Sequence, residues 1–148
     1  MGLAHSPRIV TDGLVLALDA GNTKSYPGSG TTWTDLIGSN TGTLTNGPTY
    51  SSDNGGAFEF DGTDDYILLD NGLGIGTDDF AISVWVKFDS VSGVSGSANF
   101  RTVLSSYSGG NGYIFGLWIS GDPVFEHYME QTSYKGNTTI VADTWYNM

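Results

Sequence analysis

Apolar and polar residues alternate along much of the chain, and the alternation is clearest from 80 to 88. The odd positions there are Ala81, Ser83, Trp85 and Lys87, and the even positions are all apolar: Phe80, Ile82, Val84, Val86 and Phe88. Successive side chains of a β-strand point to opposite faces, so a two-residue period indicates a strand with one face in a core. We therefore expect the five apolar residues to lie between two sheets.

Further strands are predicted wherever short alternating or apolar segments lie between turn-forming residues. Segment 112–120 is apolar on both faces, which favours a central strand, and Trp33 is expected to pack inward from a short strand. Four Asn-Gly pairs can supply the positive φ angles of tight turns, and 21–30 has loop composition. No segment has a helical period with caps, which predicts an all-β fold. The other expected strands are 13–19, 56–61, 65–70, 100–107, 123–131, 137–142 and 144–148.

Length and charge narrow the class of protein. The 148 residues suffice for one domain, expected at 12–148 after a tail at 1–11, and the 22 glycines suit many tight turns. A formal charge of -11 disfavours nucleic acid as a partner, and no apolar run is long enough for membrane insertion. The absence of cysteine excludes disulfides and thiolate metal sites. The N-terminus has no signal-peptide pattern, so we expect synthesis in the cytoplasm.

Four phrases, in order, resemble a known family. They are Gly-Leu-Val-Leu-Ala-Leu-Asp at 13–19, Trp-Thr-Asp-Leu-Ile-Gly-Ser-Asn at 33–40, Phe-Asp-Gly-Thr-Asp-Asp-Tyr at 60–66 and Phe-Ala-Ile-Ser-Val-Trp-Val-Lys at 80–87. This series is similar to that of laminin-G-like, concanavalin A-like jelly rolls, especially those of bacteriophage particle proteins and bacterial surface proteins. The resemblance implies an antiparallel β-sandwich. It favours burial of Trp85 by a loop, with a ligand platform and an interface anchor as the alternatives for this residue.

The resemblance also implies that the domain is C-terminally incomplete and lacks its last strands. In the family, a late strand opens with a phrase like Trp145-Tyr146-Asn147-Met148 and continues for about two dozen residues, whereas this sequence stops there. Because exposed sheet edges recruit further strands, we expect a neighbouring chain or a missing segment to pair at this edge.

Asp61, Asp64 and Asp65 are the candidate metal ligands, with Asp78 and Asp79 close to them in sequence. Turns rich in Asp and Gly can bring together the six to eight oxygens that Ca²⁺ prefers, so calcium is the candidate ion. The resemblance adds that relatives hold calcium at a sandwich rim. The alternative is that Asp61 and Asp64 form Asx-turns around Gly62 while Asp65 is solvated.

Catalysis is disfavoured by the spacing of the acidic residues. The family's glycosidases carry a Glu-x-Asp-x-x-Glu pattern that this chain lacks, and Glu126 and Glu130 lie roughly 13 Å apart on an extended strand, beyond the separation of either hydrolytic pair. No nucleophile elbow accompanies His5 or His127. We therefore expect no enzymatic activity.

The aromatic residues Trp118, Tyr128 and Tyr113 are the candidate glycan or partner contacts, because exposed rings stack on sugar faces. The expected function is a non-enzymatic structural or adhesion module on a bacteriophage particle, as capsid decoration or fibre protein. It would act at the virion surface with other virion proteins, copies of itself or a host-surface glycan as partners. The alternative is a carbohydrate-binding domain of a larger bacterial surface protein or glycoside hydrolase, located at the cell surface or outside the cell.

Overall fold

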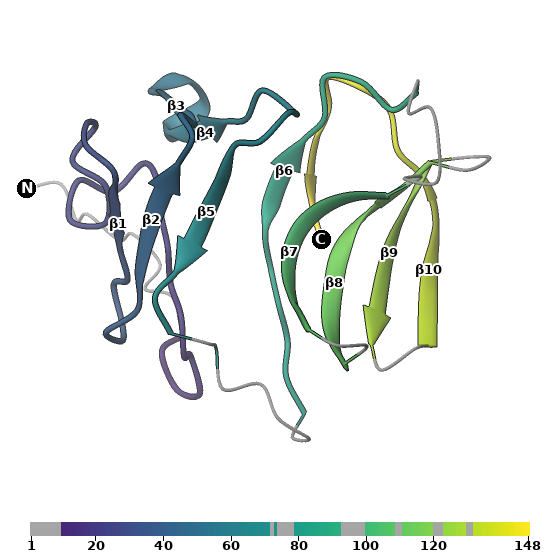
Figure 1. The fold of residues 1–148 in the computed structure, drawn as a ribbon, viewed down its shortest axis with the longest axis horizontal. Coiled ribbons are helices and arrows are strands. Elements are labelled where there is room, and N and C mark those ends of the chain that lie inside the picture. Colours follow the sequence, from purple (N-terminus) through teal and green to yellow (C-terminus); the bar gives the residue numbers. More distant parts are fainter. Residues whose placement is uncertain are drawn as a thin grey trace, which may run out of the picture. The chain divides into compact units, whose positions relative to one another are not determined.

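A computed structural model describes residues 10–71, 73, 79–92, 100–108, 111–119, 123–129 and 132–148. Among these residues it contains eleven β-strands and one short 3₁₀ helix, η1 (Asp53–Gly55), and every strand pair is antiparallel (Figure 1). The chain divides into two compact units, unit 1 (Met1–Gly76) and unit 2 (Thr77–Met148). No helix in the described part is long and apolar enough to cross a membrane.

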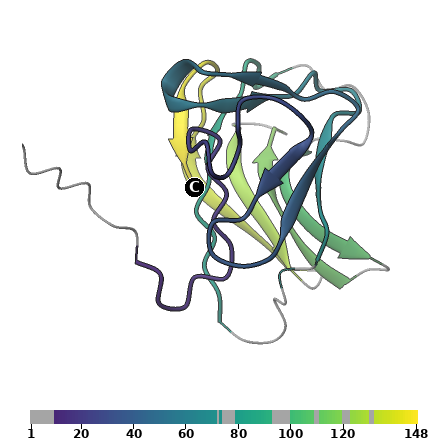
Figure 2. The ribbon, with the colours of Figure 1, turned by 90° about the vertical axis from the view of Figure 1, so that its left-hand side faces the viewer.

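Unit 1 contains two small sheets. Strands β1 (Thr32–Thr34), β2 (Thr41–Thr45) and β5 (Tyr66–Leu69) form one sheet in the order β1-β2-β5, and β3 (Thr49–Ser51) pairs with β4 (Ala57–Glu59). Figure 2, in which the left-hand side of Figure 1 faces the viewer, shows the purple and blue loops that lead into β1 and β2.

An aromatic cluster packs in unit 1 around Phe58. Its ring centroid lies 4.7 Å from that of Tyr26 and 4.8 Å from that of Trp33, both in edge-on geometries that aromatic pairs favour. Tyr50 also contacts Tyr26, at 5.1 Å. The prediction that Trp33 packs inward from a short strand is therefore confirmed.

Segment 13–19 is not a strand, and the prediction there is wrong. Gly13 turns the chain with φ 75°, and the residues after it bond to a side chain instead of a neighbouring strand. The Ala17 N–H donates to Oδ1 of Asp35 at 2.9 Å, and the Ala17 carbonyl accepts from the Leu36 N–H. Asp35 thus holds an extended segment that an apolar, alternating sequence alone would assign to a sheet.

Unit 2 is built around a four-stranded meander. Strands β7 (Phe100–Ser108), β8 (Asn111–Trp118), β9 (Val124–Met129) and β10 (Thr132–Thr139) lie in the order β10-β9-β8-β7. The interior position of β8 confirms the central strand predicted at 112–120, and Leu117 on β8 is fully buried. The bulge between Thr102 and Leu104 interrupts the β7–β8 register.

The second sheet of unit 2 pairs β6 (Trp85–Lys87) with β11 (Trp145–Asn147). It packs beside the meander, since the Phe125 ring on β9 contacts Phe88 at 6.4 Å and Tyr146 at 5.8 Å. Alternating exposure extends from Phe80 to Phe88, as predicted, although only three of these residues pair as a strand. Trp85 is 68% exposed, so the expectation that a loop buries it is wrong.

Other strand boundaries also differ from the prediction. Strands β2 and β3 were not predicted, because threonine and glycine hide the apolar alternation there. The strand expected at 137–142 lies at 132–139 instead, where every position is exposed and no apolar face marks it. Positive φ angles are found at Asn46-Gly47 and Asn54-Gly55, as expected, and at Gly112 of the Asn111-Gly112 pair, while Gly72 lies outside the described residues.

Candidate functional site

The four-stranded sheet of unit 2 presents two chemically different faces. Residues that pair across antiparallel strands share a face, so the register assigns each side chain to one of them. We call the first the polar face, with Phe100, Ile114, Gly116, Trp118, Val124, Glu126, Tyr128, Ser133 and Lys135. The second, the aromatic face, carries Tyr113, Phe115, Leu117, Phe125, His127 and Tyr134.

Glu126 lies at the centre of the polar face, opposite Gly116 on one neighbouring strand and Lys135 on the other. Only 6% of the residue is exposed. Its Oε1 accepts a hydrogen bond from the Ser133 hydroxyl, but its Oε2 is buried without a partner in the described part of the chain. A buried acceptor without a hydrogen bond costs about 1–3 kcal/mol, and more when it is charged, so this oxygen is a strong candidate for binding a donor from outside.

The packing around Gly116 explains how a glutamate becomes buried on a sheet face. Glycine leaves room that the Phe100 ring occupies, since a Cβ placed on Gly116 would lie 2.6 Å from that ring. Phe100 is paired with Trp118, so two aromatic side chains flank the carboxylate on the β7–β8 side. Both rings lie on the same face of the sheet as Glu126.

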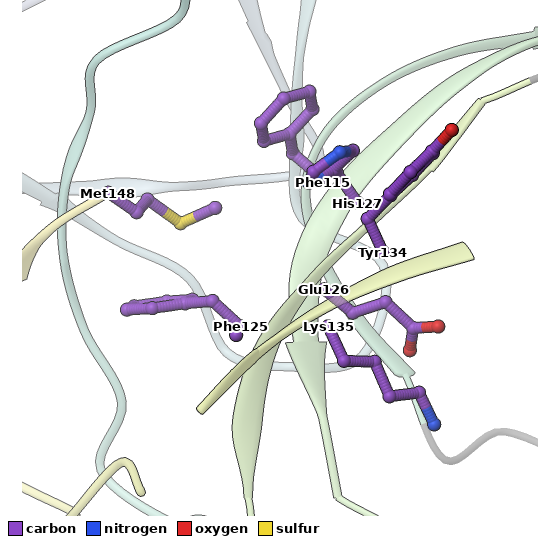
Figure 3. A pocket seen from close by; sticks show the side chains of 8 residues that line it. Phe115, Phe125, Glu126, His127, Tyr134, Lys135 and Met148 are labelled. Carbon is purple, nitrogen blue, oxygen red and sulfur yellow. The ribbon is translucent and has the colours of Figure 1, made fainter. Parts of the chain in front are cut away.

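Lys135 covers the site from the edge strand β10. Its Nζ lies 4.2 Å from the centre of the Trp118 ring, within cation–π distance. In Figure 3 the side chains of Glu126 and Lys135 extend in the same direction, while Phe125 and Met148 lie on the other side. The ammonium group therefore caps an aromatic ring beside an unpaired carboxylate oxygen.

The structure separates the three predicted aromatic contacts. Trp118 and Tyr128 both belong to the polar face, in the rows before and after that of Glu126, and both are half-buried. Tyr113 belongs to the opposite face and is 7% exposed, with its ring 6.0 Å from that of Phe80. Burial raises the pKa of the Tyr113 phenol, although a hydrogen bond with Ser106 opposes the increase. Tyr113 is therefore a packing residue and not an accessible contact, which corrects the prediction.

The aromatic face opens into a groove of about 300 Å³ (Figure 3). Three rings stack in a row across its strands: Phe115 and His127 at 5.5 Å, and His127 and Tyr134 at 4.9 Å. Phe125 and Met148 complete its apolar wall, and Glu126, Lys135 and Gly136 also line the groove. His127, which no nucleophile elbow accompanies in the sequence, is thus part of a ring stack.

The acidic cluster lies in unit 1, between β4 and β5. Asp61, Asp64 and Asp65 each place a carboxylate oxygen within 4.8 Å of the others. Asp61 accepts from the Thr63 N–H at 2.8 Å, which is one of the two Asx-turns expected as the alternative to a metal site. Asp65, expected to be solvated in that alternative, accepts from the Asp61 N–H at 3.0 Å. Asp78 lies outside the described residues.

Calcium at this cluster stays a prediction. The donor set fits Ca²⁺ in type, because all three ligands are carboxylates, but two of the carboxylates already accept backbone hydrogen bonds. If the ion binds, added calcium should raise the midpoint of thermal unfolding, and Asp64→Asn should abolish the increase. Asp64→Asn is the best test because it leaves the backbone hydrogen bonds accepted by Asp61 and Asp65 intact. An unchanged midpoint in calcium would leave the cluster as a turn only.

Of the two glutamates whose spacing disfavoured hydrolysis, the structure describes Glu126 alone. Glu126 is buried on the polar face, while Glu130 and His5 lie outside the described residues. Sequence reasoning considered Glu126 only as a catalyst and missed Lys135 altogether. The available signal was a glutamate alternating with aromatic residues in a strand, which is unusual for a surface position.

A comparison with family models identifies the class of protein. A laminin G family model, described as the concanavalin A-like lectin/glucanases superfamily, matches residues 61–148. The chain belongs to this family, which confirms the predicted resemblance and the all-β, concanavalin A-like fold class. Membership indicates a carbohydrate-binding or adhesion-type module. No curated protein and no solved structure matches the chain.

Proposed function

We propose that the protein is a non-enzymatic adhesion module that binds glycans on the polar face of unit 2. The observation that carries the proposal is the buried Oε2 of Glu126, which has no partner among the described residues. A sugar offers hydroxyl donors in close pairs, and hydrogen bonds to a charged acceptor contribute about 1.5–3 kcal/mol.

Aromatic and polar groups occur together on this face, as carbohydrate recognition requires. The Trp118 ring supplies an apolar plane for the carbon face of a sugar, while Glu126 and the Ser133 hydroxyl supply polar contacts beside it. The groove on the aromatic face also touches Glu126 and Lys135, but its other side chains are rings and a thioether, which suit sugar hydroxyls less well.

The absence of catalysis is part of the proposal. Glycoside hydrolysis by either common route needs two carboxyl groups about 5–9.5 Å apart. On the polar face, as far as it is described, Glu126 is the one carboxylate that the register places there. One acceptor can bind a sugar but cannot serve as both acid and nucleophile.

A glycan array followed by calorimetry tests the site. We expect Glu126→Gln to weaken binding of the best glycan by about tenfold, because the charged acceptor is lost while the side-chain shape is kept. Trp118→Ala should weaken it comparably by removing the stacking plane. Trp85→Ala is the matched control, because Trp85 is 68% exposed on the other sheet of unit 2.

Two results would contradict the proposed site. Equal affinities of the wild type and Glu126→Gln would remove the carboxylate from recognition. Loss of binding in Trp85→Ala, with none in Trp118→Ala, would move the site to the sheet of β6 and β11. Circular dichroism spectra of each variant should match that of the wild type.

The setting we propose is the surface of a bacteriophage particle, with other particle proteins or copies of the chain as neighbours. Its support is the resemblance to domains of such proteins, together with the charge of -11, which is compatible with a soluble surface module. The alternative setting is a larger bacterial surface protein or glycoside hydrolase. Capsid or tail genes next to the coding sequence would favour the first, and an adjoining hydrolase or anchor the second.

A further inference from the structure

Lys135 does not pair with the carboxylate beside it. Its Cα is the cross-strand partner of Glu126, yet its ammonium lies over the Trp118 ring, and Oε2 of Glu126 accepts no hydrogen bond from it. An exposed lysine on an edge strand loses little by moving, because a cation–π contact at such a site is weak. Lys135 is therefore a displaceable cover.

The groups under this cover form a receptor for a cation. An aromatic plane attracts an ammonium group through its quadrupole, and a buried carboxylate oxygen provides both a negative charge and an acceptor. Lys135 reaches the ring but leaves the oxygen unpaired, so it satisfies only half of the receptor. A ligand with an ammonium group held close to a sugar ring could satisfy both halves.

The charge of the whole chain favours the same ligand. Sixteen acidic residues against five basic ones attract cationic molecules and repel anionic glycans. A cationic glycan is one with free amino groups, that is, a chain of unacetylated amino sugars. The negative electrostatic field of the chain does not attract neutral sugars. Acidic sugars are repelled both by this field and by Glu126.

We propose that the polar face binds glycans with free, protonated amino groups, and that Lys135 occupies the ammonium position until such a ligand displaces it. This proposal rests on the glycan-binding function proposed above and names its ligand class. It predicts that removal of a cationic residue from the site increases the affinity for the ligand, because the ligand no longer competes with an internal ammonium.

Calorimetry with glucosamine oligomers, and with N-acetylglucosamine oligomers of equal length, tests the ligand class in mildly acidic buffer. We expect the free-amine oligomer to bind at least about tenfold more tightly, since acetylation removes the charge. Lys135→Ala should raise its affinity about two- to fivefold, the factor that a weak cation–π contact represents. Glu126→Gln should remove the preference for the amine.

Lys87→Ala is the matched control for net charge. Lys87 also lies over a tryptophan, with its Nζ 6.0 Å from the Trp145 ring, but in the sheet of β6 and β11. The Lys87→Ala variant loses the same charge from the same unit as Lys135→Ala. Its affinity for the amine oligomer should therefore stay within experimental error of the wild-type affinity. An equal gain in both variants would reduce the effect to long-range attraction and overturn the proposal.

Other outcomes separate this inference from the proposed function. Binding of neutral oligomers that depends on Glu126 and Trp118, without an amine preference, would refute the ligand class and leave the glycan site intact. Weaker binding in Lys135→Ala would show a direct contact and refute the displaceable cover. Equally tight binding of a lysine oligopeptide would show that the site recognises an ammonium group and not an amino sugar. That result would refute both the ligand class and the glycan-binding function.

Discussion

Replacement of Asp35 by alanine is expected to destabilise unit 1 by about 3 kcal/mol or more. Asp35 as a residue is 6% exposed, and its carboxylate accepts hydrogen bonds from the N–H groups of Ala17, Ile37 and Gly38 at 2.9 to 3.0 Å. Alanine would leave these donors without an acceptor and would release the segment after Gly13, which no sheet holds. The loss should be measurable as a lower urea midpoint of unfolding.

The same residue should make unfolding sensitive to acid. Burial of the Asp35 carboxyl raises its pKa, but the backbone N–H bonds lower it by more, so the pKa in the folded protein lies below the ordinary 3.8. The stabilisation is then fully present above this ordinary value and is lost as the pH falls through the folded pKa. In the Asp35→Ala variant, the free energy of unfolding should therefore decrease less as the pH falls through this range.

Asp35→Asn is the control for side-chain shape. It retains one oxygen acceptor in place of two, so we expect a smaller loss of stability than with alanine, and no titration. A variant Asp35→Ala as stable as the wild type, with an unchanged acid profile, would contradict the bonding scheme.

Gly116→Ala is expected to destabilise unit 2 by about 1–3 kcal/mol or more, because the new methyl group has no space. It would overlap the Arg101 carbonyl oxygen and lie 2.6 Å from the Phe100 ring. A backbone atom cannot rotate away as a side chain can, so β7 would have to shift. The shift would also uncover Glu126, and glycan affinity should fall together with the thermal midpoint.

Gly136→Ala provides a comparison within the same sheet. A Cβ at Gly136 would lie 3.3 Å from the Phe125 carbonyl oxygen, a close contact that a small adjustment relieves. Its thermal midpoint should therefore fall less than that of Gly116→Ala. An equal or larger decrease would mean that the sheet tolerates both methyl groups poorly for a reason other than the β7 contact.

The sequence was a good guide where the fold depends on local alternation. Residues 80–88 alternate in exposure as predicted, and β8 is interior because both of its faces are apolar. It failed where a distant side chain replaces a strand partner, as Asp35 does for Ala17, and where threonines mask the pattern, as in β2. Trp85 shows that a tryptophan in an alternating strand can remain exposed.

The candidate site could be predicted only in part, for a similar reason. Ring type suggested Trp118 and Tyr128, and the structure places both on the polar face. The burial of Glu126 depends on Gly116 opposite it and on Phe100 beyond, and therefore on the register of three strands. Register is a long-range property that residue spacing within one strand does not reveal.

The row of stacked rings across β8, β9 and β10 has a consequence for strand alignment. A slip of β9 by a single residue would exchange its two sets of side chains, separate His127 from Phe115 and Tyr134, and move Glu126 to the aromatic face. Loss of both stacks and burial of a charge among rings would penalise the misaligned strand. The stacked rings thus favour the observed strand alignment, in which Glu126 belongs to the polar face.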